Sequence, residues 1–331
     1  MNHRMFACTV AAVWLSAFAA LADEPAPEPA RPAAGPTAAE KKAKYALPYA
    51  MRPAIAPNLV RIDASYAGSE VEAAGRTTKF AVVSSILTAG YKPIPSLPDL
   101  GFYVRGAFVK YSVSPETTPS TNGSAFSNPL FFALYTPEIA PKFRLPLFVG
   151  LTAPIGSGSG NDPDKAKRAA VGSGIYSRQA MDNALFATNY MTPTVGAGLA
   201  WVDKGWTVQA EATVLFLRRV KGEKLDDSAR TNFTAGLNAG YQVLPFLTVS
   251  AELHYQRWLS TPTMVTRDEA KPSADRLGLR DQLTAGVGVR ANLPLDKSTI
   301  LRPGLAYFRG LDDPMAKQKY SIIQLDVAVA F

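Results

Sequence analysis

The sequence predicts an all-β fold, a single antiparallel transmembrane β-barrel of about twelve strands that follows a disordered N-terminal tail. Three observations lead to it: apolar and polar residues alternate along a dozen segments, the connections alternate between short and long, and aromatic residues gather near the segment ends. The 331 residues are 47% hydrophobic, with a mean hydropathy of -0.00. Such a balance is typical of membrane barrels, because only every second strand residue meets lipid.

Residues 58–331 form the predicted barrel domain. An even number of strands brings both ends of the barrel domain to one side of the membrane. The expected strands are 58–66, 78–91, 101–113, 128–137, 143–154, 192–202, 205–218, 231–243, 246–258, 280–293, 298–309 and 320–331.

The strand at 246–258 separates its two faces most clearly. Leu247, Val249, Ala251, Leu253 and Tyr255 share the face expected to meet lipid, and polar residues occupy the other. The strands at 231–243 and 280–293 sort in the same way. The strands at 78–91, 101–113 and 128–137 alternate less cleanly, so the sequence leaves their register open.

The connections and the aromatic residues favour a membrane barrel over a soluble β-sandwich. Short turns such as 203–205 and 244–246 alternate with long polar loops such as 114–127 and 260–279, as they do in outer-membrane barrels. Aromatic rings near the short turns predict one interfacial girdle, and rings near the long loops a second. The first set is Phe143, Trp201, Trp206, Tyr241, Phe246 and Phe331; the second is Phe216, Tyr255, Trp258 and Tyr307.

The segment 320–331, YSIIQLDVAVAF, alternates to its end and closes on an aromatic residue. It resembles the C-terminal strand of Gram-negative outer-membrane β-barrel proteins, which end in an aromatic residue that the assembly machinery reads. The resemblance implies a location in the outer membrane, with its lipid and the barrel assembly machinery as partners. It also implies an assembly signal made of Leu325, Val327, Val329 and Phe331.

The N-terminus predicts two segments that precede the barrel. Residues 1–22 read as a signal peptide, with His3 and Arg4 before an apolar core and a small-residue cleavage site at Ala20-Leu21-Ala22. Residues 23–57 are rich in Pro and Ala and predict a mobile periplasmic tail. A small plug inside the barrel is the alternative for this segment, and we expect a plug to carry its own packed apolar residues.

The lumen is expected to hold charges of both signs. These residues are Arg61, Asp63, Arg105, Arg144, Glu211, Glu252, His254, Arg290, Arg302 and Asp326. They would either fill the barrel with ion pairs or line a channel and set its solute preference, and the two roles can coexist.

The longest loop, 155–191, either stays outside or folds inward and narrows the pore. Inward folding predicts that Lys165, Lys167, Arg168 and Arg178 pair with Glu211, Glu252 and Asp326, and that Ile175, Tyr176, Leu185 and Phe186 are buried.

Other classes of function find little support. The net charge is +8 and the pI is about 9.4, but no basic helix, zinc pattern or RNA-binding motif accompanies this charge, so we expect no nucleic acid partner. Cys8 is the only cysteine and lies in the predicted signal peptide, so no cysteine metal site or disulfide is expected. No catalytic motif surrounds His254, so we expect no enzymatic activity, no catalytic residue, no metal and no cofactor.

Residues 143–160, FRLPLFVGLTAPIGSGSG, carry a second resemblance. They are similar to the strand and Pro-Thr-Gly segment of the outer-membrane transporters associated with phenol meta-pathway degradation, although Ile155 here follows Pro154 in place of the threonine. This resemblance implies passage of apolar or aromatic compounds. The predicted function is therefore an outer-membrane channel or diffusion porin for small molecules. The alternatives are a structural or surface-interaction barrel with a closed lumen and, third, a barrel hydrolase.

Overall fold

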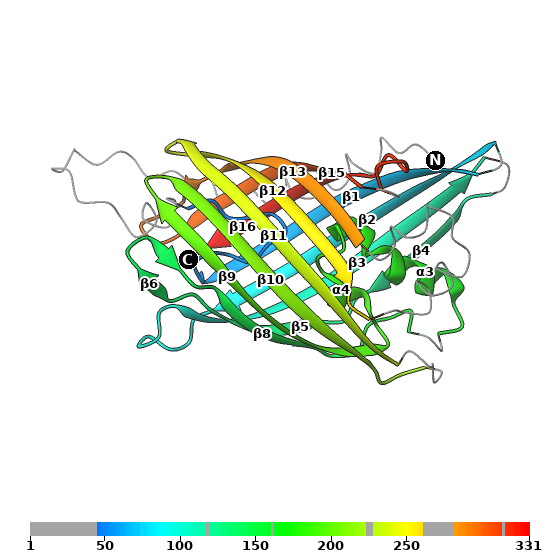
Figure 1. Cartoon of the computed structure of the whole chain (residues 1–331), viewed down its shortest axis with the longest axis horizontal. Helices are drawn as coiled ribbons and strands as arrows, with labels where there is room; N and C mark the ends of the chain where they lie inside the picture. Colours follow the sequence, from blue (N-terminus) through cyan, green and yellow to red (C-terminus); the bar gives the residue numbers. More distant parts are fainter. Residues whose placement is uncertain are drawn as a thin grey trace. The chain divides into compact units, whose positions relative to one another are not determined.

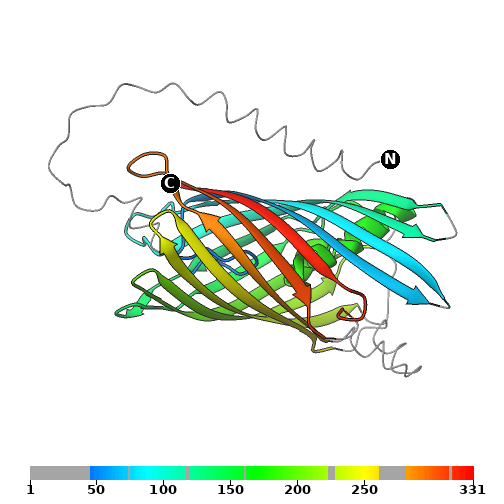
Figure 2. The ribbon, with the colours of Figure 1, turned by 90° about the horizontal axis from the view of Figure 1, so that it is seen from above.

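The computed structural model describes residues 45–73, 75–116, 119–159, 162–222, 228–260, 281–312 and 315–331. The predicted signal peptide and residues 23–44 of the predicted tail lie outside the described residues. Within them the chain forms a closed antiparallel β-barrel of 12 strands (Figures 1 and 2). The predicted fold class and all of the predicted barrel strands are confirmed.

Sixteen strand segments build the wall. They are β1 (Leu59–Ala73), β2 (Arg76–Tyr91), β3 (Leu100–Pro115), β4 (Thr121–Phe126), β5 (Leu130–Tyr135), β6 (Glu138–Ala140), β7 (Phe143–Arg144), β8 (Leu147–Thr152), β9 (Tyr190–Asp203), β10 (Trp206–Arg219), β11 (Ala229–Leu244), β12 (Leu247–Trp258), β13 (Asp281–Ala291), β14 (Leu293–Pro294), β15 (Ile300–Gly310) and β16 (Ser321–Ala330). β4 with β5 and β7 with β8 are interrupted single barrel strands. β16 closes the ring on β1, with Leu59 opposite Ala330.

Neighbouring strands are joined by turns at one end of the barrel, here called the turn end, and at the other, the loop end, by connections that are mostly longer, the two-residue turn between β1 and β2 being the exception. The turn between β9 and β10 shows why the turns form: Lys204 and Gly205 both have positive φ, 46° and 87°. A two-residue hairpin turn of this type needs positive φ at both positions.

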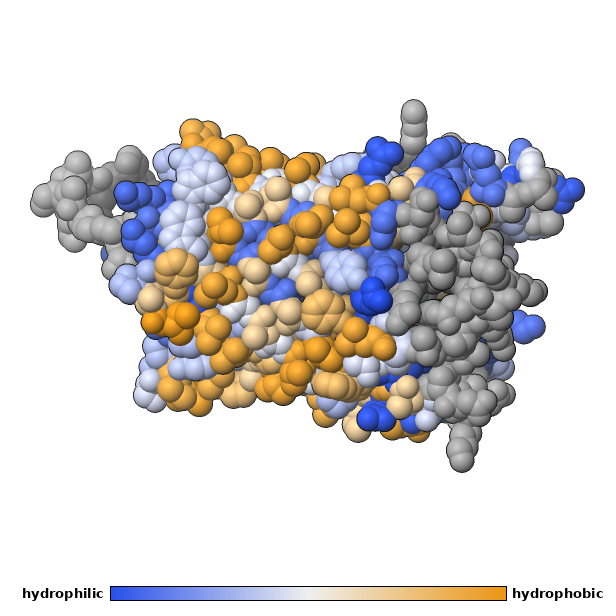
Figure 3. All heavy atoms as spheres, in the orientation of Figure 1, coloured by the Kyte–Doolittle hydropathy of each residue, from blue (hydrophilic) through white to orange (hydrophobic). Residues whose placement is uncertain are grey.

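The outer wall is apolar and the inner wall polar on β11, β12 and β13, as predicted. Leu237, Leu253 and Val287 are exposed on the outside, whereas Asn238 and Glu252 are buried inside. Apolar residues cover much of the wall, with polar residues gathered toward the ends (Figure 3). A closed strand ladder with an apolar outer band satisfies both demands of a bilayer, because no backbone edge remains exposed to lipid.

The aromatic residues expected in the two girdles are exposed or half-exposed, with one exception. Trp206 and Tyr241 lie in ring contact near the turn end, with centroids 4.5 Å apart. Trp258 was expected to face lipid, but it points inward and packs with Leu215 and Leu217, so that expectation is wrong. The physical reason is parity, since Trp258 shares the inward face of β12 with Glu252 and His254.

The long loop folds into the barrel, which is the inward alternative for residues 155–191. It carries α3 (Lys165–Ser173), η2 (Tyr176–Arg178) and α4 (Asn183–Phe186), seen in green near the loop end in Figure 1. Asp164 begins α3 by accepting the backbone N–H groups of Ala166 and Lys167. None of the helices described is long and apolar enough to cross a membrane.

Residues 45–57 also lie inside the barrel, near the turn end (Figure 2). The expectation of a mobile tail reaching residue 57 is therefore wrong for this part of the chain, and the plug alternative describes it. The segment carries the apolar residues that a plug needs, because Tyr45, Leu47, Tyr49 and Met51 are all buried.

The inner wall has a second, apolar side. On β2, β3, β5 and β8 the inward residues are mostly hydrophobic, among them Ile86, Val109, Leu134 and Phe148, and they belong to one core with loop residue Leu185. This explains why the predicted strands at 78–91, 101–113 and 128–137 alternate irregularly in the sequence. Both faces of these strands are largely apolar, the outer one toward lipid and the inner one toward the inserted segments.

Candidate functional site in the lumen

A cluster of four charges bridges β1, β13 and β16 on the polar side of the lumen. Asp63 and Asp326 lie opposite each other in the register of β1 and β16. Arg61 binds both carboxylates, with its Nε 2.7 Å from Asp63 Oδ1, and Arg290 binds Asp326 with Nη2–Oδ2 at 2.9 Å. All four side chains are buried, and two carboxylates this close require the two guanidinium groups as counter-charges.

A second cluster joins the wall to the N-terminal segment. His254 Nε2 lies 2.9 Å from Glu252 Oε2, and the His254 ring stacks on Phe308 at 5.5 Å between centroids. On β10, Glu211 Oε1 accepts from Arg52 Nη1 at 2.8 Å. Glu252 also accepts the backbone N–H of Ala50 at 3.1 Å, so both carboxylates bind the inserted segment.

A third cluster anchors the inward loop. Asp182 accepts from both Nη atoms of Arg105, at 2.7 and 3.0 Å, and from Arg178 Nε at 3.0 Å. The expectation that Arg178 reaches Glu211, Glu252 or Asp326 is wrong, because Asp182 on the same loop lies nearer.

The other loop cations do not reach the lumen carboxylates either. Lys165 and Lys167 are exposed on α3, and Arg168 donates to the backbone oxygen of Asp162. Leu185 and Phe186 are buried as predicted, whereas Tyr176 stays 40% exposed. Hydrophobic packing and the Asp182 cluster, rather than pairing with the wall carboxylates, hold the loop inside.

The predicted lumen residues are brought together inside the barrel with one exception. Arg144 is half-buried at the turn end, where it pairs with Asp99 at 2.9 Å and Glu138 at 3.2 Å. It was expected in the lumen, but β7 places it beside the acidic turn residues at the rim. Arg302 points inward, and its guanidinium lies 4.7 Å from the centroid of the Tyr45 ring.

Sequence reasoning missed Tyr49, Arg52 and Asp182, which take part in these clusters. Tyr49 and Arg52 lay in the predicted tail. The signal that identifies them is the unbroken run of apolar residues at 45–51, YALPYAM, which is more than a solvated tail needs. Nothing in the sequence connects Asp182 to Arg105, which lies on a distant strand.

Several buried polar atoms on the wall from β9 to β12 have no hydrogen-bond partner among the described residues. They include both amide atoms of Asn238, Gln209 Oε1, Thr194 Oγ1 and His254 Nδ1. Gln209 and Asn238 are neighbours in the register of β10 and β11. Buried polar groups without protein partners are places where water or a polar solute binds.

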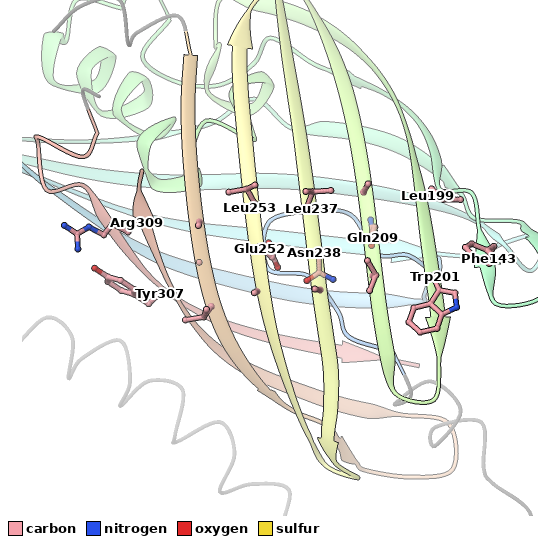
Figure 4. A pocket seen from close by; sticks show the side chains of 17 residues that line it. Phe143, Leu199, Trp201, Gln209, Leu237, Asn238, Glu252, Leu253, Tyr307 and Arg309 are labelled. Carbon is pink, nitrogen blue, oxygen red and sulfur yellow. The ribbon is translucent and has the colours of Figure 1, made fainter. Parts of the chain in front are cut away.

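A groove of about 820 Å³ crosses β9 to β15, but it lies on the outside of the barrel. In Figure 4, Leu199, Leu237 and Leu253 line it, while Glu252 and Asn238 on the same strands point the other way, into the lumen. Its lining is the lipid-facing set, so the groove meets acyl chains and is separate from the lumen clusters.

The described residues offer little for metal or hydrolytic chemistry. No group of three or more His, Cys, Asp or Glu side chains among them could hold a metal ion. The sole lumen histidine is confined by Glu252 and Phe308 deep inside the wall, away from the outer surface where a lipid substrate would arrive.

No protein-family model and no curated protein matches the sequence. Among solved structures, an outer-membrane channel from Pseudomonas putida F1 is similar at a TM-score of 0.52 and 14% identity, covering 86% of this chain and 98% of that chain. The transport unit of an Escherichia coli autotransporter gives 0.45 and 12%, covering 83% and 90%. The NanC porin gives 0.43 and 8%, covering 82% and 98%. At these identities the similarity concerns the fold alone. The closed strand ladder and the apolar outer band make this chain a membrane-spanning β-barrel of the outer-membrane type.

Proposed function

We propose that the protein is an outer-membrane channel for small molecules, held shut by residues 45–57 at the turn end and by the inward part of the long loop, residues 174–188, at the loop end. The observation that carries this proposal is the polar inner wall, where buried side-chain atoms of residues such as Asn238, Thr284 and Gln324 have no hydrogen-bond partner among the described residues. A barrel built only as a solid scaffold would gain stability by satisfying or replacing these buried groups.

A closed structural barrel is the second candidate, and the filled lumen favours it. The two candidates differ in what happens when the inserted segments are removed. A channel gains a conducting path along the polar wall between β9 and β13, whereas a scaffold loses stability and gains no defined conductance.

Single-channel recording on the refolded full chain tests this, beside variants without residues 45–57, without residues 160–184 and without both segments. We expect rare openings in the full chain, more frequent openings in each single variant because one closure remains, and a marked rise in conductance when both segments are removed. Heat-modifiable mobility verifies that each variant is folded. Folded variants that never conduct would refute the channel and leave the structural barrel.

The class of solute can be tested with the same refolded protein. The resemblance of residues 143–160 makes small apolar or aromatic compounds the first solutes to test by liposome swelling, and the polar wall makes small sugars and amino acids the comparison. We also propose that His254 has no catalytic role. A phospholipid or peptide hydrolysis that His254→Ala abolishes would overturn this.

We further propose that the barrel assembly machinery recognises the last strand through its outward residues. Leu325 and Phe331 are exposed on the outer face, and Phe331 donates its backbone N–H to Asn58 O at 3.2 Å, next to the seam where β16 meets β1. An apolar, accessible edge beside the closing seam suits recognition before the barrel closes.

A further inference from the structure

We propose that the inside of this barrel is a peptide-binding site whose resident ligand is the chain's own residues 45–57, and that this segment withdraws and rebinds through the turn end. The ligand class is a short peptide that bends at an aromatic residue and carries an arginine three positions later. The binding step itself is independent of solute passage, and only its consequence for opening rests on the proposed function.

Side chains of the wall bind the backbone of the segment. The two carboxylate oxygens of Glu252 accept the N–H groups of Tyr49 and Ala50, and Glu211 accepts that of Arg52 at 3.2 Å. In the other direction, Arg61 donates to Pro48 O at 3.0 Å and to Tyr49 O at 2.6 Å.

The same pattern continues along the segment. Thr207, Thr136, Gln209, Gln324, Arg302 and Tyr103 make further side-chain hydrogen bonds to its backbone. A surface whose fixed side chains satisfy the backbone N–H and C=O groups of a segment is suited to binding a peptide.

Two side chains of the segment act as anchors. The Tyr49 ring lies under the Arg290 guanidinium, 4.4 Å from the ring centroid, and its hydroxyl donates to Val289 O. The Arg52 guanidinium lies 3.3 Å from the centroid of Phe148 and is bound by Glu211. Buried aromatic and arginine anchors carry most of the affinity in peptide and protein interfaces.

The wall leaves out side chains where the segment lies. A Cβ at Gly240 would stand 2.2 Å from Ala46 Cβ, one at Gly288 2.4 Å from the Tyr49 ring, and one at Gly304 2.6 Å from the Tyr49 hydroxyl. These glycines face the lumen on three different strands. Because these positions have no side chains, the backbone of the segment and the Tyr49 ring can lie directly against the wall.

The segment enters and leaves by one end of the barrel. Leu47 packs with Leu59, Ile300 and Ala330, which lie where β1 and β15 begin and β16 ends. At its other end the segment runs directly into β1 at the same rim. It can therefore be withdrawn without threading and without breaking a strand ladder, because its bonds to the wall are side-chain contacts.

The test measures access to residue 51 in the full chain. Met51 is 3% exposed, so in a Cys8→Ser, Met51→Cys chain a bulky maleimide reaches residue 51 only after the segment leaves. A synthetic peptide of residues 45–57 occupies the emptied site and raises the labelling rate by the factor 1 + [peptide]/Kd. Because a tethered segment acts at roughly millimolar effective concentration, the peptide is added in that range.

The control peptide carries Ala in place of Tyr49 and Arg52, and we expect it to leave the rate unchanged. Adding Glu252→Gln to the chain should raise the rate without peptide. Equal rates with the two peptides, or labelling no faster than unfolding measured by heat-modifiable mobility, would overturn the proposal.

A second variant locks the segment in place. A Cβ at Gly236 would lie 2.9 Å from Met51 Cγ, the position that a cysteine sulfur takes, so Gly236→Cys with Met51→Cys can form a disulfide in the Cys8→Ser chain. The oxidised chain should bind no peptide, and reduction should restore binding, followed on a fluorescent peptide by anisotropy. Peptide binding unaffected by the lock would also overturn the proposal.

Conductance separates this inference from the channel. Peptide competition without conductance in any folded variant would refute the channel and leave the peptide site. Conductance of the variant without residues 45–57, unaffected by the peptide, would refute the peptide site and leave the channel.

Discussion

Asp182 should control whether the long loop stays inside the barrel. Its carboxylate is the shared partner of Arg105 and Arg178, whose exposed fractions are 9% and 1%. Asp182→Asn preserves the shape of the side chain but leaves two buried guanidinium groups without their carboxylate. Removing one partner of a buried ion pair costs about 3–5 kcal/mol. Since about 1.4 kcal/mol changes an equilibrium constant tenfold, the inward state should lose a factor of about 10² to 10⁴ relative to the outward state.

Two assays follow the change. In Asp182→Asn, limited proteolysis within residues 160–188 should become faster by the same factor of about 10² to 10⁴, up to the point where the outward state dominates. Single-channel recording of this variant should show longer or larger openings. The matched control is Asp99→Asn, which removes a partner of Arg144 at the half-exposed rim and should cost no more than about 1 kcal/mol. If Asp182→Asn behaved like Asp99→Asn in both assays, the reasoning that this ion pair holds the loop would be refuted.

Three further predictions concern assembly, the outer wall and a turn. Phe331→Asp should reduce folded barrel in the membrane fraction, read by heat-modifiable mobility, more than it reduces refolding in detergent; equal effects would argue against an assembly signal. Leu253→Arg on the outer wall should lower unfolding free energy by about 2–4 kcal/mol in bilayer titrations, against about 0–1 for Leu293→Arg near the turn end; similar costs would contradict the assigned depths. The backbone N–H of Ser298, with the donors of Thr299, lowers the pKa of Asp296 to about 2. The Asp296 carboxylate should therefore stabilise this turn fully above pH 3.8, and the stabilisation should be lost as the pH falls through about 2. An Asp296 pKa near 3.8 in an NMR titration would contradict this.

The sequence predicted the wall well and its contents poorly. Alternation along β12 assigned Glu252 to the lumen and Leu253 to lipid because a period of two is a local property that each strand carries by itself. What fills the lumen depends on contacts between distant segments. Arg105 and Asp182 are 77 positions apart, and Tyr49 meets Glu252 across 203 positions.

The prediction that residues 45–57 belong to a mobile tail was wrong for a further reason. The prolines and alanines of residues 23–57 are typical of a disordered linker, and they obscured the apolar residues gathered at its end, 45–57. Residues 45–57 nevertheless stay in place because the wall supplies the hydrogen bonds that their backbone cannot make within itself. Composition describes what a segment can do alone, whereas Tyr45 to Pro57 is held by carboxylates and guanidinium groups of other strands.

The apolar inner wall of β2, β3, β5 and β8 bears on how these strands find their partners. Where one strand face is polar and the other apolar, sliding by one residue reverses both faces and is strongly opposed. With two apolar faces that opposition is weak, so the correct pairing of these strands needs another source. The inserted segments provide it, since Arg105 meets Asp182 and the Tyr103 hydroxyl meets Pro57 O only in one alignment. The long loop and residues 45–57 would then act as a template during assembly for these four of the twelve barrel strands.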